Sequence, residues 1–341
     1  MDPGTKHDTR HGAEPGTSSG MSSRTLLRIV LLVQALVALA IGAVAVRWFA
    51  ATAWQGAALG LLAVVLVRLA INANNFRLSA RVASPTPPAH RLGVTAALRM
   101  FGEEFGASML FSSWHMPRAR AHARIHAHAR LPPVLLLHGY GCNSGYWAHL
   151  APLLDARRIS HAALDLEPLT GDIDGYVPAI EEAVAHLCAR TGRREVAIVA
   201  HSMGGLAARA WMRAHGTGRL ARLVTLGSPH HGTCLAAFGI GINADQMRRA
   251  GVDGPPCAWL EALARAEDAA TRALITSIWS HHDNIVAPQD SGHLAGARNH
   301  ALGGVGHVAL GRNRRVLAAV LAELEALGTE QGVPAALHHR T

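Results

Sequence analysis

The stretch VAIVAHSMGGLAARA, residues 196–210, constrains the fold more than any other part of the chain. Its first five residues are all apolar, which is typical of a strand buried on both faces of a sheet. Its second half has apolar residues at helical spacing, and the turn between the halves contains Ser202 and two glycines. A strand that passes directly into a helix is the repeating unit of a parallel α/β fold.

The same alternation of short apolar runs and helical patterns continues from residue 133 onward. Apolar residues recur at helical spacing in 176–189 and in 206–214. Buried strands are predicted at 134–137, 162–166, 196–200, 223–226 and 274–279. This order predicts an α/β fold with a mostly parallel sheet that is covered by helices on both faces.

Two long apolar runs, at 29–46 and 49–67, precede this region. Each has roughly 18 to 20 residues, which is enough to cross the hydrocarbon core of a bilayer as a helix. Trp48 and Trp54 flank the joint between the runs, and aromatic residues anchor helices at membrane interfaces. We therefore predict an N-terminal transmembrane helical hairpin.

Arginines predict how this hairpin is oriented. Arg24 and Arg28 precede it, the joint contains only Arg47, and four more arginines follow, at positions 68, 77, 81 and 91. Because cytoplasmic flanks carry an excess of basic residues, both ends are expected in the cytoplasm, with the following domain facing the cytosol from the cytoplasmic membrane. A cleaved signal peptide is the alternative for the first run, since basic residues also precede the apolar part of such peptides.

The chain is expected to divide into five parts. The predicted parts are a disordered polar tail at 1–28, two transmembrane helices at 29–71, a linker with an amphipathic helix at 72–132, a catalytic domain at 133–328 and a C-terminal tail at 329–341. The proline-rich stretch 84–88 marks the start of the linker proper. Within the linker, the cationic stretch 118–130 is interpreted as a solvated connector rather than a strip that binds lipid headgroups.

Composition argues against several classes of function. The formal net charge is +9, but the arginines are scattered and no nucleic-acid motif accompanies them, so no nucleic-acid partner is expected. The four cysteines form no CxxC pair, and the 22 histidines include no HExxH spacing. We therefore expect no metal site and free thiols in a reducing compartment. No feature of the sequence specifies an oligomeric state.

Ser202 stands where a nucleophile is expected in a parallel α/β fold. A strand, one exposed serine and an immediate helix form a nucleophile elbow, which lifts the hydroxyl above the edge of the sheet. Gly204 supplies the small residue that the turn needs, whereas Ala200 replaces the glycine that usually precedes the serine by two positions. The alternative is a structural serine that caps the helix.

A serine nucleophile needs a base, and the base needs a carboxylate that orients it. Asp283 follows a predicted strand, and His307 lies on a glycine-rich loop before the last predicted helix. The chain order serine, acid, histidine is the order of α/β hydrolases. Asp290 competes as the acid, and the competing bases are His281, His282 and His300.

The transition state of acyl transfer also needs hydrogen-bond donors for its oxyanion. The backbone amides of Tyr140, after the first predicted strand of the domain, and of Met203, after the nucleophile, are the expected donors. His138 is expected to hold the first of these loops by hydrogen bonds rather than to take part in catalysis.

From about residue 133 to residue 328 the chain resembles the α/β-hydrolase superfamily, in particular bacterial triacylglycerol lipases and esterases with an AHSMGG elbow. The matching blocks are LLLHGYGCNSGYW, AHSMGGLAARA, TLGSPHHGT, SHHDNIVAP and GVGHVAL, in that order. The resemblance implies ester hydrolysis through an acyl-enzyme, with Ser202, Asp283 and His307 as the triad and no cofactor. It also implies structural roles for His230 and His231. The stretch 234–247 is either a lid or acyl-binding segment, or an ordinary buried helix.

Taken together, these features predict a membrane-anchored serine hydrolase, a lipase or carboxylesterase, that cleaves apolar acyl esters or lipids. An acyltransferase or thioesterase would use the same triad and is the first alternative. A membrane-bound binding protein without catalysis is the second, although such a protein has no need of an acid and a base in register with a serine.

Overall fold

The computed structural model describes residues 22–330, so most of the two predicted tails lies outside the described residues. The first helix, α1 (Ser23–Trp48), begins inside the tail that was predicted to reach residue 28. The reason is local, because the Ser22 side chain accepts a hydrogen bond from the Thr25 amide and caps the helix.

A seven-stranded sheet forms the centre of the molecule, with the strand order β1-β3-β2-β4-β5-β6-β7. β1 is antiparallel to β3, and all other neighbours are parallel, as predicted. The strands are β1 (Ala123–Arg124), β2 (Val134–Leu137), β3 (His161–Leu164), β4 (Val196–His201), β5 (Leu220–Leu226), β6 (Ile275–Ser280) and β7 (Arg298–Leu302).

The two strands that the sequence pattern missed, β1 and β7, are the edges of this sheet. β1 is fully exposed and lies in the stretch that was interpreted as a solvated connector, and none of the residues of β7 is buried. Strands without a buried face show no apolar pattern, which is why periodicity finds the five central strands and not the edges.

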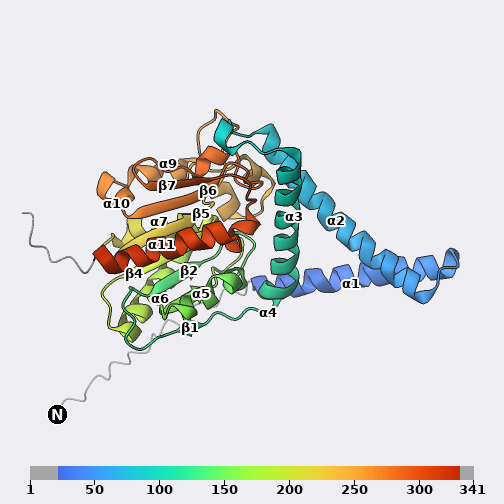
Figure 1. Ribbon diagram of the computed structural model, residues 1–341, viewed down its shortest axis with the longest axis horizontal. Helices are drawn as coiled ribbons and strands as arrows, with labels where there is room; N and C mark the ends of the chain where they lie inside the picture. Colours follow the sequence, from blue (N-terminus) through green and yellow to red (C-terminus); the bar gives the residue numbers. More distant parts are fainter. Residues whose placement is uncertain (1–21, 331–341) are drawn as a thin grey trace, which may run out of the picture.

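Alternate residues of the central strands point into two separate hydrophobic cores. Leu135 of β2 and Ile198 of β4 belong to the core beneath α6 (Val177–Thr191) and α7 (Met203–His215). Leu136 and Val199 belong to the opposite core, beneath α5 (Ala151–Ala156) and α11 (Arg314–Glu330), and Figure 1 shows α11 crossing this face. Helices therefore cover both faces, as expected for strands that are apolar throughout.

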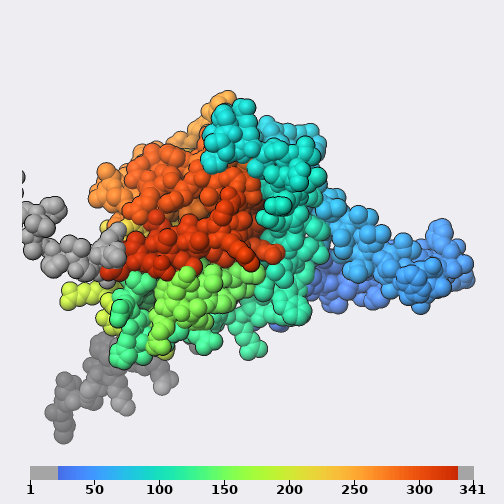
Figure 2. Space-filling view, viewed as in Figure 1, coloured from blue at the N-terminus to red at the C-terminus, as the bar shows by residue number. Residues whose placement is uncertain are grey.

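Two helices stand clear of this body, as Figures 1 and 2 show. α1 leaves the body and α2 (Ala53–Arg81) returns to it, and both are long and apolar enough to cross a membrane. α2 continues past the predicted end at residue 71, because no proline or glycine interrupts the polar residues that follow.

Glycines allow the backbones of α1 and α2 to touch. A Cβ atom on Gly60 would lie 2.0 Å from the Ala38 carbonyl oxygen, and one on Gly56 would lie 2.7 Å from the Gly42 carbonyl oxygen. Small residues four apart are typical of helix pairs that associate in lipid, where close packing replaces the hydrophobic effect. On the outside, large apolar side chains such as Leu39, which is 69% exposed, have no protein cover.

The predicted linker is not a free tether. Ser84 is buried, its amide donates to the Gln289 side chain at 3.1 Å, and its hydroxyl accepts from the Asp290 amide at 3.1 Å. The next helix, α3 (Val94–Leu110), packs along the side of the body in Figure 1 and contributes Ala107 to the core beneath α11. Contacts therefore run across the boundary that the sequence predicted at residue 133.

A buried ion pair holds the helix that follows Ser202. Arg209 of α7 binds Glu267 through two hydrogen bonds of 2.6 and 2.8 Å, and the two side chains are 0% and 3% exposed. We expect Glu267→Gln to lower the free energy of unfolding by about 3–5 kcal/mol, because it leaves a buried cation without its partner. Denaturant unfolding of the purified chain in detergent measures this loss.

Glu325→Gln is the matched control for this prediction. Glu325 pairs with Arg157 at 2.7 Å, but these side chains are 55% and 40% exposed. The expected loss is below about 1 kcal/mol, because water screens an exposed pair. Equal losses in the two variants would contradict the assignment of a stabilising role to the buried pair.

Candidate active site

Ser202 lies at the sharp turn between β4 and α7 with φ 53° and ψ −125°, a conformation that residues with a side chain rarely adopt. Small residues surround the turn. A Cβ atom on Gly204 would lie 2.5 Å from the His138 carbonyl oxygen, and one on Gly139 would lie 2.8 Å from the Ser202 Cβ. The turn has the strand–serine–helix form of a nucleophile elbow, and the Ser202 side chain makes no capping hydrogen bond to α7.

Asp283 and His307 form a buried pair at the same edge of the sheet. Asp283 follows β6, and its Oδ2 lies 2.7 Å from His307 Nδ1. Its Oδ1 accepts hydrogen bonds from the amides of Ile285 and Val286, at 2.8 and 2.7 Å. Because both oxygens of Asp283 are engaged, the carboxylate is held in one orientation. The His307 ring then donates through Nδ1, which leaves Nε2 free to accept a proton.

The competing residues have other surroundings. Asp290 is exposed, and its amide is held by Ser84. His281 makes an edge-to-face contact with Trp279, with ring centroids 4.5 Å apart. His282 accepts a hydrogen bond from the Gly304 amide, and His300 lies 3.2 Å from Glu323. Of the candidate acids and bases, the structure brings only Asp283 and His307 together.

His201 lies between Ser202 and His307. It directly precedes Ser202, its ring centroid lies 4.6 Å from that of His307, and its Nε2 donates to the His307 carbonyl at 3.3 Å. The ring also stacks on Tyr146 at 4.0 Å. Burial lowers the pKa of His201 well below its usual value, so this histidine is a neutral spacer in the wall of the site.

The environment of His307 favours its protonated form. Burial lowers the pKa of the ring, but the Asp283 carboxylate and Glu104 raise it by more, so that the pKa of His307 is above its ordinary value. A histidine whose positive charge is stabilised in this way can hold the proton that it takes from a serine.

Glu104 is a residue of the site that the sequence pattern did not indicate. It lies on α3 with 1% of its surface exposed, and it accepts the amides of Val308 and Ala309 at 3.0 and 2.8 Å. These amides begin the turn that directly follows His307, so Glu104 positions the base from outside the predicted catalytic domain. Burial raises the pKa of Glu104. An amphipathic helical pattern with one acidic residue on its apolar face was the only signal in the sequence.

Of the expected oxyanion donors, Tyr140 lies on the first loop of the domain, after β2, and Met203 is the first residue of α7, directly after Ser202. Neither the Tyr140 amide nor the Met203 amide donates to another described residue. His138 holds the first loop as predicted, because its Nε2 accepts from the Leu166 amide at 2.8 Å and its Nδ1 lies 2.9 Å from the Gly139 carbonyl. Its ring therefore carries the hydrogen on Nδ1 and is occupied on both sides.

Ser202 lines a cavity of about 620 Å³. Most of its wall is apolar, and the largest single contribution comes from 234–247. This segment folds as a 3-10 turn (Cys234–Phe238) and α8 (Ile242–Gln246) rather than as one buried helix. The Tyr140 hydroxyl holds this segment by donating to the Ile240 carbonyl at 2.8 Å. The last part of α2, from Asn74 to Leu78, forms another side of the cavity.

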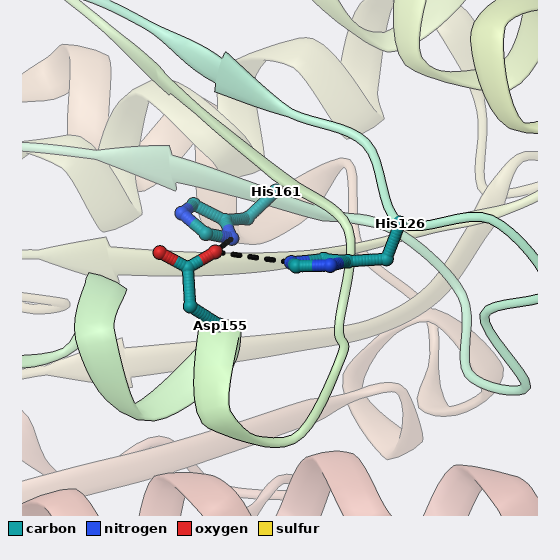
Figure 3. A group of neighbouring side chains, drawn as sticks. All are labelled: His126, Asp155 and His161. Atoms are coloured by element: carbon teal, nitrogen blue, oxygen red, sulfur yellow. Dashed lines mark hydrogen bonds and ion pairs between the residues drawn. The ribbon is translucent and has the colours of Figure 1, made fainter.

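Outside this site, one group of described residues has the side chains of a metal site. His126, Asp155 and His161 have ligand-type atoms within 4.8 Å of one another (Figure 3). The nitrogens that face Asp155 already have protein partners, since His126 Nε2 lies 3.0 Å from Asp155 and His161 Nδ1 lies 3.1 Å from the Ile159 carbonyl. His161 begins β3 and so lies at the amino ends of the parallel strands, whereas Ser202 lies at their carboxyl ends. We assign the group to holding β1 against β3.

His230 has the structural role that was expected. It is buried, and its Nε2 lies 3.1 Å from the Thr225 hydroxyl while its Nδ1 lies 3.3 Å from Arg209. His231 lies 3.1 Å from the His293 carbonyl through Nε2. The His230 ring therefore links its loop to β5 and α7, the His231 ring contacts the loop before β7, and neither residue lines the cavity.

Known proteins share this architecture. A family profile described as the alpha/beta hydrolase fold matches residues 132–254. The mature form of the Bacillus licheniformis lipase BlEst2 has a TM-score of 0.50 and 19% identity, over 60% of this chain and 98% of that one. The propeptide form has a TM-score of 0.50 and 18% identity, over 60% of this chain and 53% of that one. The chain therefore has the α/β-hydrolase fold that its sequence predicted.

The role of Glu104 can be tested through the pH dependence of turnover. Glu104→Gln keeps one acceptor oxygen but removes the charge, so we expect kcat to fall by up to about a hundredfold as the His307 loop shifts. Since Glu104 raises the pKa of His307, the variant should also lower it. A base works only when neutral, and the acid limb of kcat/KM should therefore move to lower pH.

Glu103→Gln is the control, because Glu103 is the exposed neighbour of Glu104 on the same helix. It should change neither the rate nor the pH profile. If the Glu104 variant and the wild type have the same pH profile, the charge of Glu104 does not raise the pKa of His307, and Glu104 acts only by packing.

Proposed function

We propose that the chain is a membrane-anchored serine hydrolase of the α/β-hydrolase fold, a lipase or carboxylesterase that cleaves carboxylic esters through an acyl-enzyme. The observation that carries this proposal is the 2.7 Å contact of Asp283 with His307, whose ring lies 4.6 Å from that of His201. The residue after His201 is Ser202, which has φ 53° and lines a mainly apolar cavity. A purely structural serine has no need of a buried acid and base next to it.

In the proposed reaction, His307 Nε2 takes the proton of the Ser202 hydroxyl as its oxygen attacks the ester carbonyl carbon. The amides of Tyr140 and Met203 stabilise the negative charge that develops on the carbonyl oxygen. His307 then gives the proton to the departing alcohol, which leaves an acyl group on Ser202. A water molecule, deprotonated by the same nitrogen, attacks this ester, releases the acid and restores the serine.

The form of the cavity supports an apolar acyl ester as the substrate. Leu235, Ala236, Phe238 and Met247 line it beside Ser202 and offer an acyl chain a surface that excludes water. The Bacillus licheniformis protein of similar fold is named a lipase, which agrees with this substrate class.

The exposed surface of the two long helices supports insertion in a membrane. Their outward side chains are large and apolar from Ile29 to Val46 in α1 and as far as Ile71 in α2, and soluble monomers rarely expose a contiguous apolar surface of this extent to water. The arginines on both outer flanks support a hairpin with the body on the cytosolic side. Both helices meet the body at one end, which agrees with this orientation (Figure 1).

Ser202→Ala should lower the hydrolysis of p-nitrophenyl esters by about 10⁴-fold or more, because no acyl-enzyme can form. Asp283→Asn should lower it by several orders of magnitude, whereas the exposed Asp290→Asn should leave it near the wild-type value. Release of thiol from acyl-CoA, measured in parallel, distinguishes a thioesterase. A wild-type rate in Ser202→Ala, or a larger loss in Asp290→Asn than in Asp283→Asn, would overturn the assignment.

The orientation can be tested with protease and sealed vesicles. A tag at the C-terminus should resist digestion in right-side-out vesicles and should be digested in inverted vesicles, because the arginines hold both ends of the hairpin in the cytoplasm. A second tag in the joint between the helices, next to Trp48, should behave in the opposite way. Digestion of the C-terminal tag in intact right-side-out vesicles would place the catalytic body outside the cell.

A further inference from the structure

The end of α2 is both the end of a long apolar helix and a wall of the catalytic cavity. The large exposed apolar side chains of α2 reach Ile71, and polar residues follow at once. Asn74, Asn75, Arg77 and Leu78 then line the cavity that contains Ser202. One helix therefore connects the region proposed to lie in the membrane with the site of ester cleavage.

Arg77 has an unusual position in this wall. It is the only charged side chain among the described residues that line the cavity, and it is exposed. Its side-chain hydrogen bonds run to Asn74 Oδ1, at 3.4 Å from Nε and 3.3 Å from one terminal nitrogen, and no carboxylate of the described chain pairs with it. The guanidinium is thus oriented by a neutral side chain while most of its donors and its full charge remain available.

The position of Arg77 along α2 indicates which part of a lipid its guanidinium would meet. Arg77 lies six positions beyond Ile71, which is about 9 Å along an α-helix. The headgroup layer on one side of a bilayer is roughly 5–8 Å thick. The end of the apolar surface at Ile71 therefore puts the Arg77 backbone just outside this layer. Side chains of a helix tilt toward its N-terminus, and the Arg77 side chain bonds to Asn74 one turn earlier, so the guanidinium is directed back toward the lipid phosphates.

We propose that this end of α2 is a headgroup subsite, in which Arg77 and the amide of Asn74 bind the phosphate of an anionic phospholipid whose acyl ester reaches Ser202. This inference rests on the proposed ester hydrolysis and adds the class of its substrate. The guanidinium offers paired N–H donors to two phosphate oxygens, and the adjacent amide NH₂ offers a further donor. The apolar wall formed by 234–247 receives the acyl chain, with Phe238 and Ile240 exposed at 71% and 74% beside it.

The test compares two soluble substrates that differ only in the phosphate, dihexanoylglycerol-3-phosphate and dihexanoylglycerol, both as monomers so that no charged surface is present. The readout is the ratio of their kcat/KM values for the full chain in neutral detergent. The wild type should favour the phosphate ester, and Arg77→Gln should lower the ratio by roughly tenfold to a hundredfold, the usual worth of hydrogen bonds to a charged group. Arg77→Lys, which keeps the charge but not the paired donors, should restore part of it.

Arg81→Gln is the matched control, because Arg81 is one turn further along the same helix, is equally exposed and does not line the cavity. It should leave the ratio unchanged. An equal loss in both variants would mean that general charge near the site, rather than a subsite, favours the anionic substrate, and this would overturn the proposal.

Two further outcomes separate the possible sources of failure. If the wild type cleaves both substrates but shows no preference, the headgroup subsite is wrong and the ester hydrolase stands. If it cleaves neither and no p-nitrophenyl ester either, the proposed function itself fails. If millimolar inorganic phosphate inhibits dihexanoylglycerol hydrolysis in the wild type but not in Arg77→Gln, while the wild type shows no preference for the phosphate ester, the site binds free phosphate and the lipid assignment is overturned.

Discussion

The backbone of Ser202 is the constraint on which the site depends. A residue with a side chain at φ 53° and ψ −125° is held against a cost of about 1–3 kcal/mol, so the surrounding structure has to impose it. It does so by close contact, since Gly204 and Gly139 leave no room for a Cβ atom beside the turn. The amide of Ser202 is also tied to the Leu226 carbonyl of the next strand at 2.9 Å. The hydroxyl is thereby presented to the cavity instead of capping α7.

The segment before the catalytic domain reaches every part of this site. The end of α2 walls the cavity, Ser84 binds the loop that carries the acid, and Glu104 binds the turn that follows the base. All three contacts are made by the stretch 72–132, which the sequence predicted to be a linker with an amphipathic helix. The two long helices and the α/β body are consequently packed as one structure, and a shift of the helices would act directly on the loops that hold Asp283 and His307.

Much of this was predictable from local pattern. The central strands, the helices on both faces and the parallel order all follow from apolar periodicity, because residues buried on both faces leave a continuous apolar signal. The elbow at Ser202 was also visible, since a strand, a small-residue turn and a helix are adjacent in the sequence. The edge strands β1 and β7 were not, because their residues are exposed or only partly buried.

The sequence by itself determined the fold class, the position of Ser202 and the order in which an acid and a histidine follow it. Only the tertiary structure paired Asp283 rather than Asp290 with His307. Both carboxylates lie on the segment after β6, and the folding of this segment decides which of them reaches His307. The tertiary structure also decided that Glu104 supports the base and that α2 closes the cavity. Glu104 and Val308 are 204 positions apart, and the spacing of neighbouring residues in the sequence cannot predict a contact over that separation. Such contacts arise when two packed elements meet, and they exist only in the folded chain.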